Sequence, residues 1–286
     1  MNHKTPVVDS HQHFWDLNRF DYFWMTGDAI RPIQRTFGPD DLGPLLRENG
    51  VDATVLVQAL MSVEETRWFM ETAAATPFVA GVVGWVDLLA PDVADVVAEL
   101  QARPDGKTLV GVRHMVQDEP DPDWLRQPGV KRGLRALTDA GLAYDLLLKP
   151  PQIAAATRLC AELPDVRFVV DHIAKPPIAS GELAAWRDLM APFAEMPHVL
   201  CKLSGMITEA DWAAWAPGDL VPYVQQTMEW FGEDRVMFGS DWPVCLLAGS
   251  YGQVKSALEH ALGPVSDETR AKVFGGNANR FYGLNL

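Results

Sequence analysis

The chain has few cysteines, and their spacing does not suit a metal site or a disulfide framework. Cys160, Cys201 and Cys245 are far apart, stand in apolar segments and form no C-x-x-C pair. This argues against a thiolate zinc site. It predicts instead buried free thiols, as in proteins of a reducing cytosol.

Basic residues and long apolar stretches are also scarce. The 24 Lys and Arg residues face 38 Asp and Glu residues, which gives a net charge of −14 without any basic block. Nucleic acid and anionic membrane surfaces are therefore not expected partners. The longest uncharged stretch, residues 72–86, is shorter than a membrane span, and the N-terminus has no apolar signal core. A cytoplasmic protein without membrane segments is expected.

Short apolar runs recur along the chain, and segments with helical spacing separate them. This alternation predicts parallel strands joined by crossover helices. Eight such runs in 286 residues match a closed (β/α)8 barrel of the TIM type, with residues 1–286 as a single domain. An open doubly wound sheet is the alternative, because periodicity does not show closure. The runs cover residues 6–15, 52–60, 78–88, 109–116, 142–149, 167–175, 198–206 and 235–243.

Ionisable residues gather at one end of these runs, as expected where catalytic side chains lie at the carboxyl ends of barrel strands. Asp9, His11 and His13 alternate on the first run, so we expect all three to project to one face. The later runs end in Arg113 and His114, Lys149, Asp171 and His172, Lys202 and Ser204, and Ser240 and Asp241.

Three histidines and one aspartate form the candidate reaction centre. His11, His13, His172 and Asp241 are imidazole and carboxylate groups, the ligands that zinc-like ions prefer. Asp241 could equally serve as a general base for water. The alternative for the His11 and His13 pair is two solvated or hydrogen-bonded histidines at a strand end.

Other strand-end residues are candidates for substrate binding. We expect His114 to donate a hydrogen bond to a substrate oxygen, with a core histidine as the alternative. Arg113 has the opposite parity and is a weaker candidate, since it would then face the helices. Lys202 is a candidate for substrate binding or, alternatively, a strand-end lysine. Asp171 is expected to point away from His172 and to make a structural hydrogen bond.

The segment from residue 16 to 39 is long for a strand-to-helix connection and rich in aromatic rings. Such loops are usually functional or disordered, and the aromatic residues argue against disorder. We expect a wall or lid over the pocket. Trp24 in this segment and Trp242 near the end of the chain could pack on a sugar ring, with ordinary loop packing as the alternative.

Several motifs of this sequence resemble the amidohydrolase superfamily. They are VVDSHQHFWD (7–16), DHIAKP (171–176), CKLSGM (201–206), GSDWP (239–243) and the ending GGNANRFYGL (275–284). The resemblance is to the branch called amidohydrolase 2, which includes sugar-acid lactonases. It implies a (β/α)8 barrel and hydrolysis by water. His11 and His13 match the first-strand pair, His172 the sixth-strand histidine and Asp241 the last-strand aspartate.

Two departures from the superfamily pattern limit the metal content that the resemblance implies. Members with two metals carry a bridging lysine on the fourth strand and a ligand histidine on the fifth. Here the corresponding strand ends show His114 and Lys149. We therefore expect at most one divalent ion, with zinc favoured, and treat its need in turnover as a separate question.

The resemblance leads to hydrolysis of a sugar lactone such as L-fuconolactone or L-rhamnonolactone. Asp241 would take a proton from water, which attacks the carbonyl, while His114, Lys202 or an ion on the histidines holds the oxyanion. The alternatives are a metal-dependent decarboxylase of the same superfamily and a non-catalytic barrel that binds a small molecule. The oligomeric state stays open, with a homo-oligomer possible.

Overall fold

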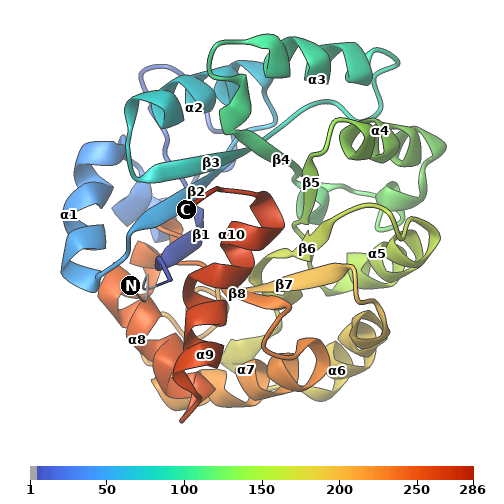
Figure 1. Cartoon of the computed structure of the whole chain (residues 1–286). Coiled ribbons are helices and arrows are strands. Elements are labelled where there is room, and N and C mark those ends of the chain that lie inside the picture. Colours follow the sequence, from blue (N-terminus) through green and yellow to red (C-terminus); the bar gives the residue numbers. More distant parts are fainter. Residues whose placement is uncertain (1–4) are drawn as a thin grey trace.

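The computed structural model describes residues 5–286 and contains one eight-stranded sheet. Each strand pairs in parallel with the next along the chain. Beyond the last strand, Asp241 N donates to His11 O at 2.8 Å and His13 N donates to Trp242 O at 2.7 Å, which closes the ring. The predicted TIM-type barrel is confirmed, and the open sheet is excluded (Figure 1). The strands are β1 (Val8–Gln12), β2 (Ala53–Val57), β3 (Val79–Gly84), β4 (Leu109–His114), β5 (Ala143–Leu146), β6 (Phe168–Val170), β7 (Val199–Leu203) and β8 (Val236–Phe238).

Helices surround the strands, and several begin where the sequence favours a helix start (Figure 1). Proline, whose fixed φ suits the first helical turn, opens α1, α4, α5 and α7. Ser62 caps α2 by accepting from Glu65 N. The helices are α1 (Pro39–Asn49), α2 (Val63–Ala75), α3 (Val93–Ala102), α4 (Pro128–Asp139), α5 (Pro150–Glu162), α6 (Ala184–Met190), α7 (Pro217–Phe231), α8 (Tyr251–Leu262), α9 (Asp267–Ala271) and α10 (Asn277–Tyr282).

The barrel interior changes from apolar to charged along its axis. Small and branched residues from the strands pack against α10, which lies across the middle of the strand ring (Figure 1). Beyond this apolar plug come buried charged residues, including Asp145 and Lys202. The plug consists of Val8, Ala53, Val55, Val57, Val83, Val110, Ala143, Val169, Met237, Ala278, Phe281, Tyr282 and Leu284.

An irregularity in β1 overturns one prediction. Asp9 pairs with Thr54 and Gln12 pairs with Leu56, so β1 advances three residues while β2 advances two. An extra residue of this kind inverts the alternation of side chains. The Asp9 carboxylate therefore accepts from Ser240 Oγ at 2.6 Å and from the Tyr251 hydroxyl on α8 at 3.0 Å. It does not project with His11 and His13, as the strict alternation had predicted.

The described residues test two expectations from composition, one about membrane-spanning segments and one about the cysteines. Within residues 5–286, no helix is long and apolar enough to cross a membrane. Cys160, Cys201 and Cys245 are buried and free, as their spacing predicted.

Candidate active site

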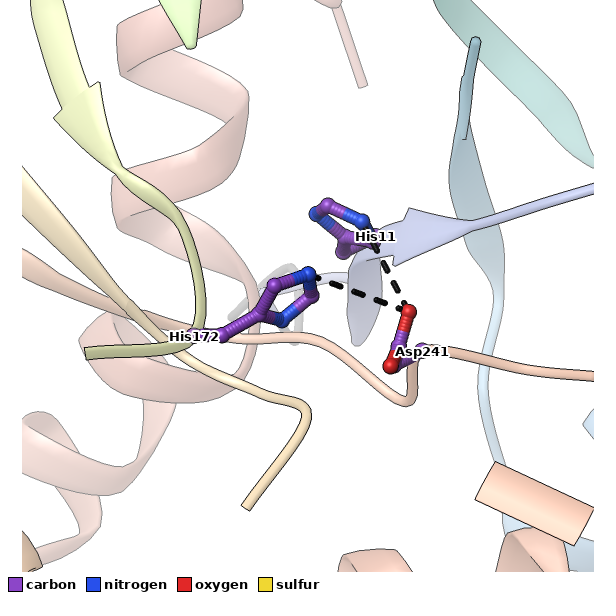
Figure 2. Close-up of side chains that lie close together, drawn as sticks. All are labelled: His11, His172 and Asp241. Atoms are coloured by element: carbon purple, nitrogen blue, oxygen red, sulfur yellow. Dashed lines mark ion pairs between the residues drawn. The ribbon is translucent and has the colours of Figure 1, made fainter. Parts of the chain in front are cut away.

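Side chains from distant segments meet around one carboxylate oxygen at the carboxyl end of the barrel (Figure 2). Oδ1 of Asp241, just after β8, lies 3.2 Å from His13 Nε2 and 3.8 Å from His11 Nε2. It lies 3.9 Å from Nε2 of His172, just after β6. All four residues are buried. The structure thus brings together the four residues singled out as the reaction centre, and we call them the reaction cluster.

An uncommon backbone conformation presents two members of this cluster. The φ angles of His172 and Asp241 are 54° and 56°, in the left-handed region that few non-glycine residues adopt. Such conformations cost about 1–3 kcal/mol each and concentrate at functional sites. Gly205 packs against the His172 ring, where an added Cβ would come within 2.5 Å of Nδ1. Any larger residue at position 205 would displace this imidazole.

The electrostatics of the reaction cluster favour neutral imidazoles beside an ionised carboxylate. Burial lowers the pKa of His11, His13 and His172, the last to about 4. Burial alone would raise the pKa of Asp241, but His172, His13 and His11 together hold it well below its usual range. At neutral pH, Asp241 is therefore the charged member of the cluster.

At the end of β4, Arg113 and His114 point in directions opposite to those expected. Arg113 points into the barrel, where its Nη1 lies 3.1 Å from both His11 Nε2 and Asp171 Oδ2. His114 points elsewhere and bonds to Glu119 Oε1 at 2.7 Å, and its ring stacks on Trp124. It is absent from the cavity lining, so the expectation that it binds a substrate oxygen lacks structural support.

Lys202 and Asp171 lie beneath the reaction cluster. Lys202 is fully buried, and its Nζ lies 2.5 Å from Asp145 Oδ2 and 3.0 Å from both Asp171 Oδ1 and His11 Nδ1. It does not line the cavity, contrary to its expected contact with substrate. Asp171 also faces inward, against expectation. Although burial opposes its ionisation, Lys202, His11 and Arg113 hold its pKa well below the ordinary value.

A cavity of about 200 Å³ opens beside the reaction cluster. Trp24 lines it, and its indole nitrogen donates to Ala59 O at 2.8 Å. Trp242 does not line it and packs instead on Phe37 and Phe14 inside the protein. The lining consists of His13, Trp15, Trp24, Ala59, Arg113, Met115, Gln117, Asp118, Leu147, His172, Lys175, Asp241 and Val244.

Sequence reasoning missed several of these lining residues. Trp15 follows His13 at the same parity, and Lys175 stands in the motif that contains His172, so a signal existed for both. Gln117 and Asp118 lie in a short 3-10 helix, Val116–Asp118, that follows β4 and is too short to show a periodicity in the sequence. Only the folded chain brings these two residues to the cavity.

The reaction cluster fits one divalent cation. One ligand atom from each of His11, His172 and Asp241 lies within 4.8 Å of the others. His13 Nδ1 donates to Val57 O at 2.7 Å, so its Nε2 carries a lone pair toward the Asp241 carboxylate 3.2 Å away. Two acceptors facing each other leave room for a cation or a proton between them. The donor set of imidazole nitrogens and carboxylate oxygen is one that zinc accepts.

Comparison with known proteins agrees with this geometry. The amidohydrolase family model matches residues 8–284, almost the whole chain. The chain belongs to the amidohydrolase family. The resemblance inferred from the motifs at positions 7–16, 171–176, 201–206 and 239–243 is therefore confirmed.

Two relatives and one solved structure illustrate this membership. The chain is 42% identical to the L-fucono-1,5-lactonase of Burkholderia ambifaria, over 98% of this chain and 97% of that one. It is 38% identical to the L-fucono-1,5-lactonase of Burkholderia multivorans, over 97% and 96%. A crystal structure of a B. multivorans amidohydrolase with bound zinc has a TM-score of 0.90 and 38% identity, over 97% of this chain and 99% of that one.

Proposed function

We propose that this amidohydrolase opens a sugar-acid lactone by hydrolysis, with L-fucono-1,5-lactone or a related aldonolactone as substrate. The observation that carries the proposal is the convergence of His11, His13, His172 and Asp241 on one point beside a small cavity. The relatives from B. ambifaria and B. multivorans, both named L-fucono-1,5-lactonase, support the substrate class.

Asp241 acts as the general base in this proposal. Its carboxylate lines the cavity and is ionised at neutral pH, so it can accept a proton from a water molecule held beside it. The water oxygen attacks the lactone carbonyl, and the bond from that carbon to the ring oxygen breaks. Asp241 then returns the proton to the departing ring oxygen, which leaves a free hydroxyl and a carboxylic acid. His172, also at the cavity, orients the water.

Arg113 holds the oxyanion in this proposal, in place of His114 and Lys202, which do not line the cavity. Its guanidinium lines the cavity and already contacts His11, so a donor faces the reaction cluster. Asp171 and Gln58 hold the same guanidinium from behind, through Nη1 and Nε, which preorganises it. Donors aimed in advance at a developing negative charge are among the largest contributions to catalysis.

The same cluster would hold at most one divalent ion, with His11, His13, His172 and Asp241 as ligands. Zinc is the proposed ion, because a relative at 38% identity crystallises with bound zinc. When bound, such an ion polarises a carbonyl and increases the acidity of water. A carboxylate that binds the ion through its lone pairs is not free to act as a base. The experiment below therefore also measures whether activity requires a metal.

The cavity walls suit a ring with one apolar face and several hydroxyl groups. Trp24, which is partly exposed, offers an aromatic group for packing, and the fully buried Trp15 lies beside it in the cavity wall. Gln117, Asp118 and Lys175 offer hydrogen-bonding groups for hydroxyl oxygens. This division supports a sugar lactone and explains a contact role for Trp24 that Trp242 does not share.

A panel of sugar lactones tests the proposal, with acid release followed by a pH indicator, before and after treatment with a chelator. We expect acid release from deoxysugar lactones, and Asp241→Asn is expected to reduce its rate by about 10²–10⁴-fold. Carbon dioxide release from aromatic acids, lost on chelation, would favour the decarboxylase instead. Binding of lactones without turnover would favour a binding barrel. A cytoplasmic location and a homo-oligomeric state stay predictions.

A further inference from the structure

A row of hydrogen-bonding groups runs beneath the cavity from Lys202 to the main chain of β2. Lys202 Nζ lies 3.0 Å from His11 Nδ1, and His11 Nε2 lies 3.2 Å from His13 Nε2. His13 Nδ1 lies 2.7 Å from the carbonyl oxygen of Val57. All four residues are buried, so these contacts form one continuous row of three links away from bulk solvent.

The two ends of the row determine its direction. The ammonium group of Lys202 can only donate, so His11 Nδ1 must offer a lone pair. The Val57 carbonyl can only accept, so His13 Nδ1 must carry a proton. In neutral rings, His11 then carries its proton on Nε2 and His13 carries its lone pair on Nε2. The contact between the two rings becomes a hydrogen bond from His11 to His13.

We propose that Lys202 is a positioning residue that sets the tautomer of His11, and so decides whether His11 presents a proton or a lone pair at the reaction cluster. With the ammonium in place, His11 presents a proton at Nε2. This inference goes beyond the proposed lactone hydrolysis. It concerns the free protein, so it can fail or hold independently of the substrate.

Two neighbouring residues, Asp171 and Arg113, favour the opposite tautomer of His11. Together their contacts with His11 are longer than those of the row. Asp171 Oδ1 lies 3.4 Å from His11 Nδ1, against 3.0 Å for Lys202. Arg113 Nη1 lies 3.1 Å from His11 Nε2 and could donate to a lone pair there. That tautomer would, however, turn the Nε2 lone pairs of His11 and His13 toward each other at 3.2 Å.

Facing lone pairs are unfavourable unless a cation lies between them; His13 Nε2 and Asp241 Oδ1 already face each other in this way in both tautomers, so only the contact between the two rings differs. The opposite tautomer of His11, with its Nδ1 proton on Asp171, is therefore the form ready to bind a metal. Lys202 works against this form. It also turns the His11 Nε2 proton toward the Arg113 Nη1 donor 3.1 Å away, so the assigned tautomer sets the two favourable hydrogen bonds of His11 in the row against this one unfavourable contact.

The position of Lys202 is itself secured from the opposite end of the barrel. Its ammonium contacts Asp145 Oδ2 at 2.5 Å and Asp171 Oδ1 at 3.0 Å. Asp145 in turn accepts from the hydroxyl of Tyr282 at 2.8 Å, on the helix α10 that crosses the strand ring (Figure 1). The ammonium donates to Asp145 but only forms an ion pair with Asp171 Oδ1, so a proton is available for His11.

The tautomers can be read directly by long-range proton–nitrogen correlation NMR on ¹⁵N-histidine-labelled, metal-free protein. The His11 signals are assigned by their loss in His11→Gln. In the wild type we expect a proton on Nε2 of His11 and on Nδ1 of His13. Lys202→Met keeps the length of the side chain but removes its donor, so we expect the His11 proton to move to Nδ1. A wild-type His11 protonated on Nδ1 would overturn the proposal, even if Lys202→Met does not fold.

Zinc binding to the metal-free protein gives a second readout without any substrate. Calorimetric titration should show tighter zinc binding to Lys202→Met, by about 10-fold or more, the scale on which groups behind a metal ligand act. Lys149→Met is the matched control, because Lys149 lies half exposed at 3.5 Å from Asp118, outside the row. Equal gains in zinc affinity for both variants would reduce the effect to net charge and overturn the proposal. An unchanged affinity in Lys202→Met would do the same.

Discussion

Two groups of buried charges lie next to each other at the carboxyl end of the barrel, and they are built differently. The lower group, which we call the charge layer, consists of Arg113, Asp145, Asp171 and Lys202, so two cations face two carboxylates. In the reaction cluster above it, a single carboxylate faces three imidazoles whose pKa values are lowered.

This difference separates support from chemistry, except at Arg113, which belongs to the charge layer and also lines the cavity. In the charge layer, each charge is compensated by a fixed partner, so the layer holds neighbouring side chains in place. In the reaction cluster, the Asp241 charge faces imidazoles that are neutral at neutral pH and opens onto the cavity, where a proton or cation can be bound. A paired interior charge supports the fold, whereas an incompletely paired one at a cavity can react.

The largest expected effect concerns the reaction cluster. Asp241→Asn keeps the size of the side chain but removes the base, so we expect kcat/KM for lactone hydrolysis to fall by about 10²–10⁴-fold. Initial rates of acid release measure this effect, and circular dichroism checks that the fold is retained. A variant within a few-fold of the wild-type rate would remove Asp241 from the role of base.

The next effect concerns the charge layer and stability. Asp145→Ala leaves Lys202 with one carboxylate fewer in the interior, so we expect the free energy of unfolding to fall by about 3–5 kcal/mol. Urea unfolding measures it. Asp165→Ala is the control at an exposed position, with an expected change within about 0.5 kcal/mol. Similar losses in the two variants would show that the charge layer does not support the fold.

A third effect concerns Glu65, a buried carboxylate that forms no ion pair within residues 5–286. Burial raises the pKa of Glu65 to about 8, although its Oε2 accepts from the main-chain nitrogens of Ala59 and Leu60. The folded state therefore holds this proton more tightly than the unfolded state. Its contribution to stability is full below pH 4.5 and is lost as the pH rises toward 8.

Glu65→Gln removes this titration. We expect the wild type to lose up to about 1.4 kcal/mol of unfolding free energy per pH unit in this window relative to Glu65→Gln. Urea unfolding at several pH values for both proteins measures the difference. Parallel stability curves would show that Glu65 titrates normally.

The smallest expected effect is a change in KM that distinguishes Trp24 from Trp242. Trp24 lines the cavity, so Trp24→Phe should raise KM by about 2- to 10-fold, as expected for losing 0.5–1.5 kcal/mol of aromatic contact. Trp242 packs on Phe37 away from the cavity, so Trp242→Phe should change thermal stability and leave KM as it is. A larger KM effect at Trp242 would reverse this assignment.

Much of the fold and of the reaction cluster followed from local patterns. Eight apolar runs with polar ends predicted the barrel, and His11, His13, His172 and Asp241 stood out at strand ends. The orientation of individual side chains did not follow. Asp9 left the predicted face because β1 contains an extra residue relative to β2. Arg113 and His114 exchanged their expected directions, because alternation shows that neighbours differ but not which one points inward.

The amino-acid order therefore determined the class of fold and the chemical groups available to it, since both depend on periodicity and residue type over short distances. Tertiary structure alone decided the partners of those groups: Lys202 against His11, Tyr282 against Asp145, and Asp241 against three imidazoles. Hydrogen bonds and charge interactions depend on separations of a few ångströms between residues that can be more than 200 positions apart in the chain. Such distances exist only after the barrel has closed.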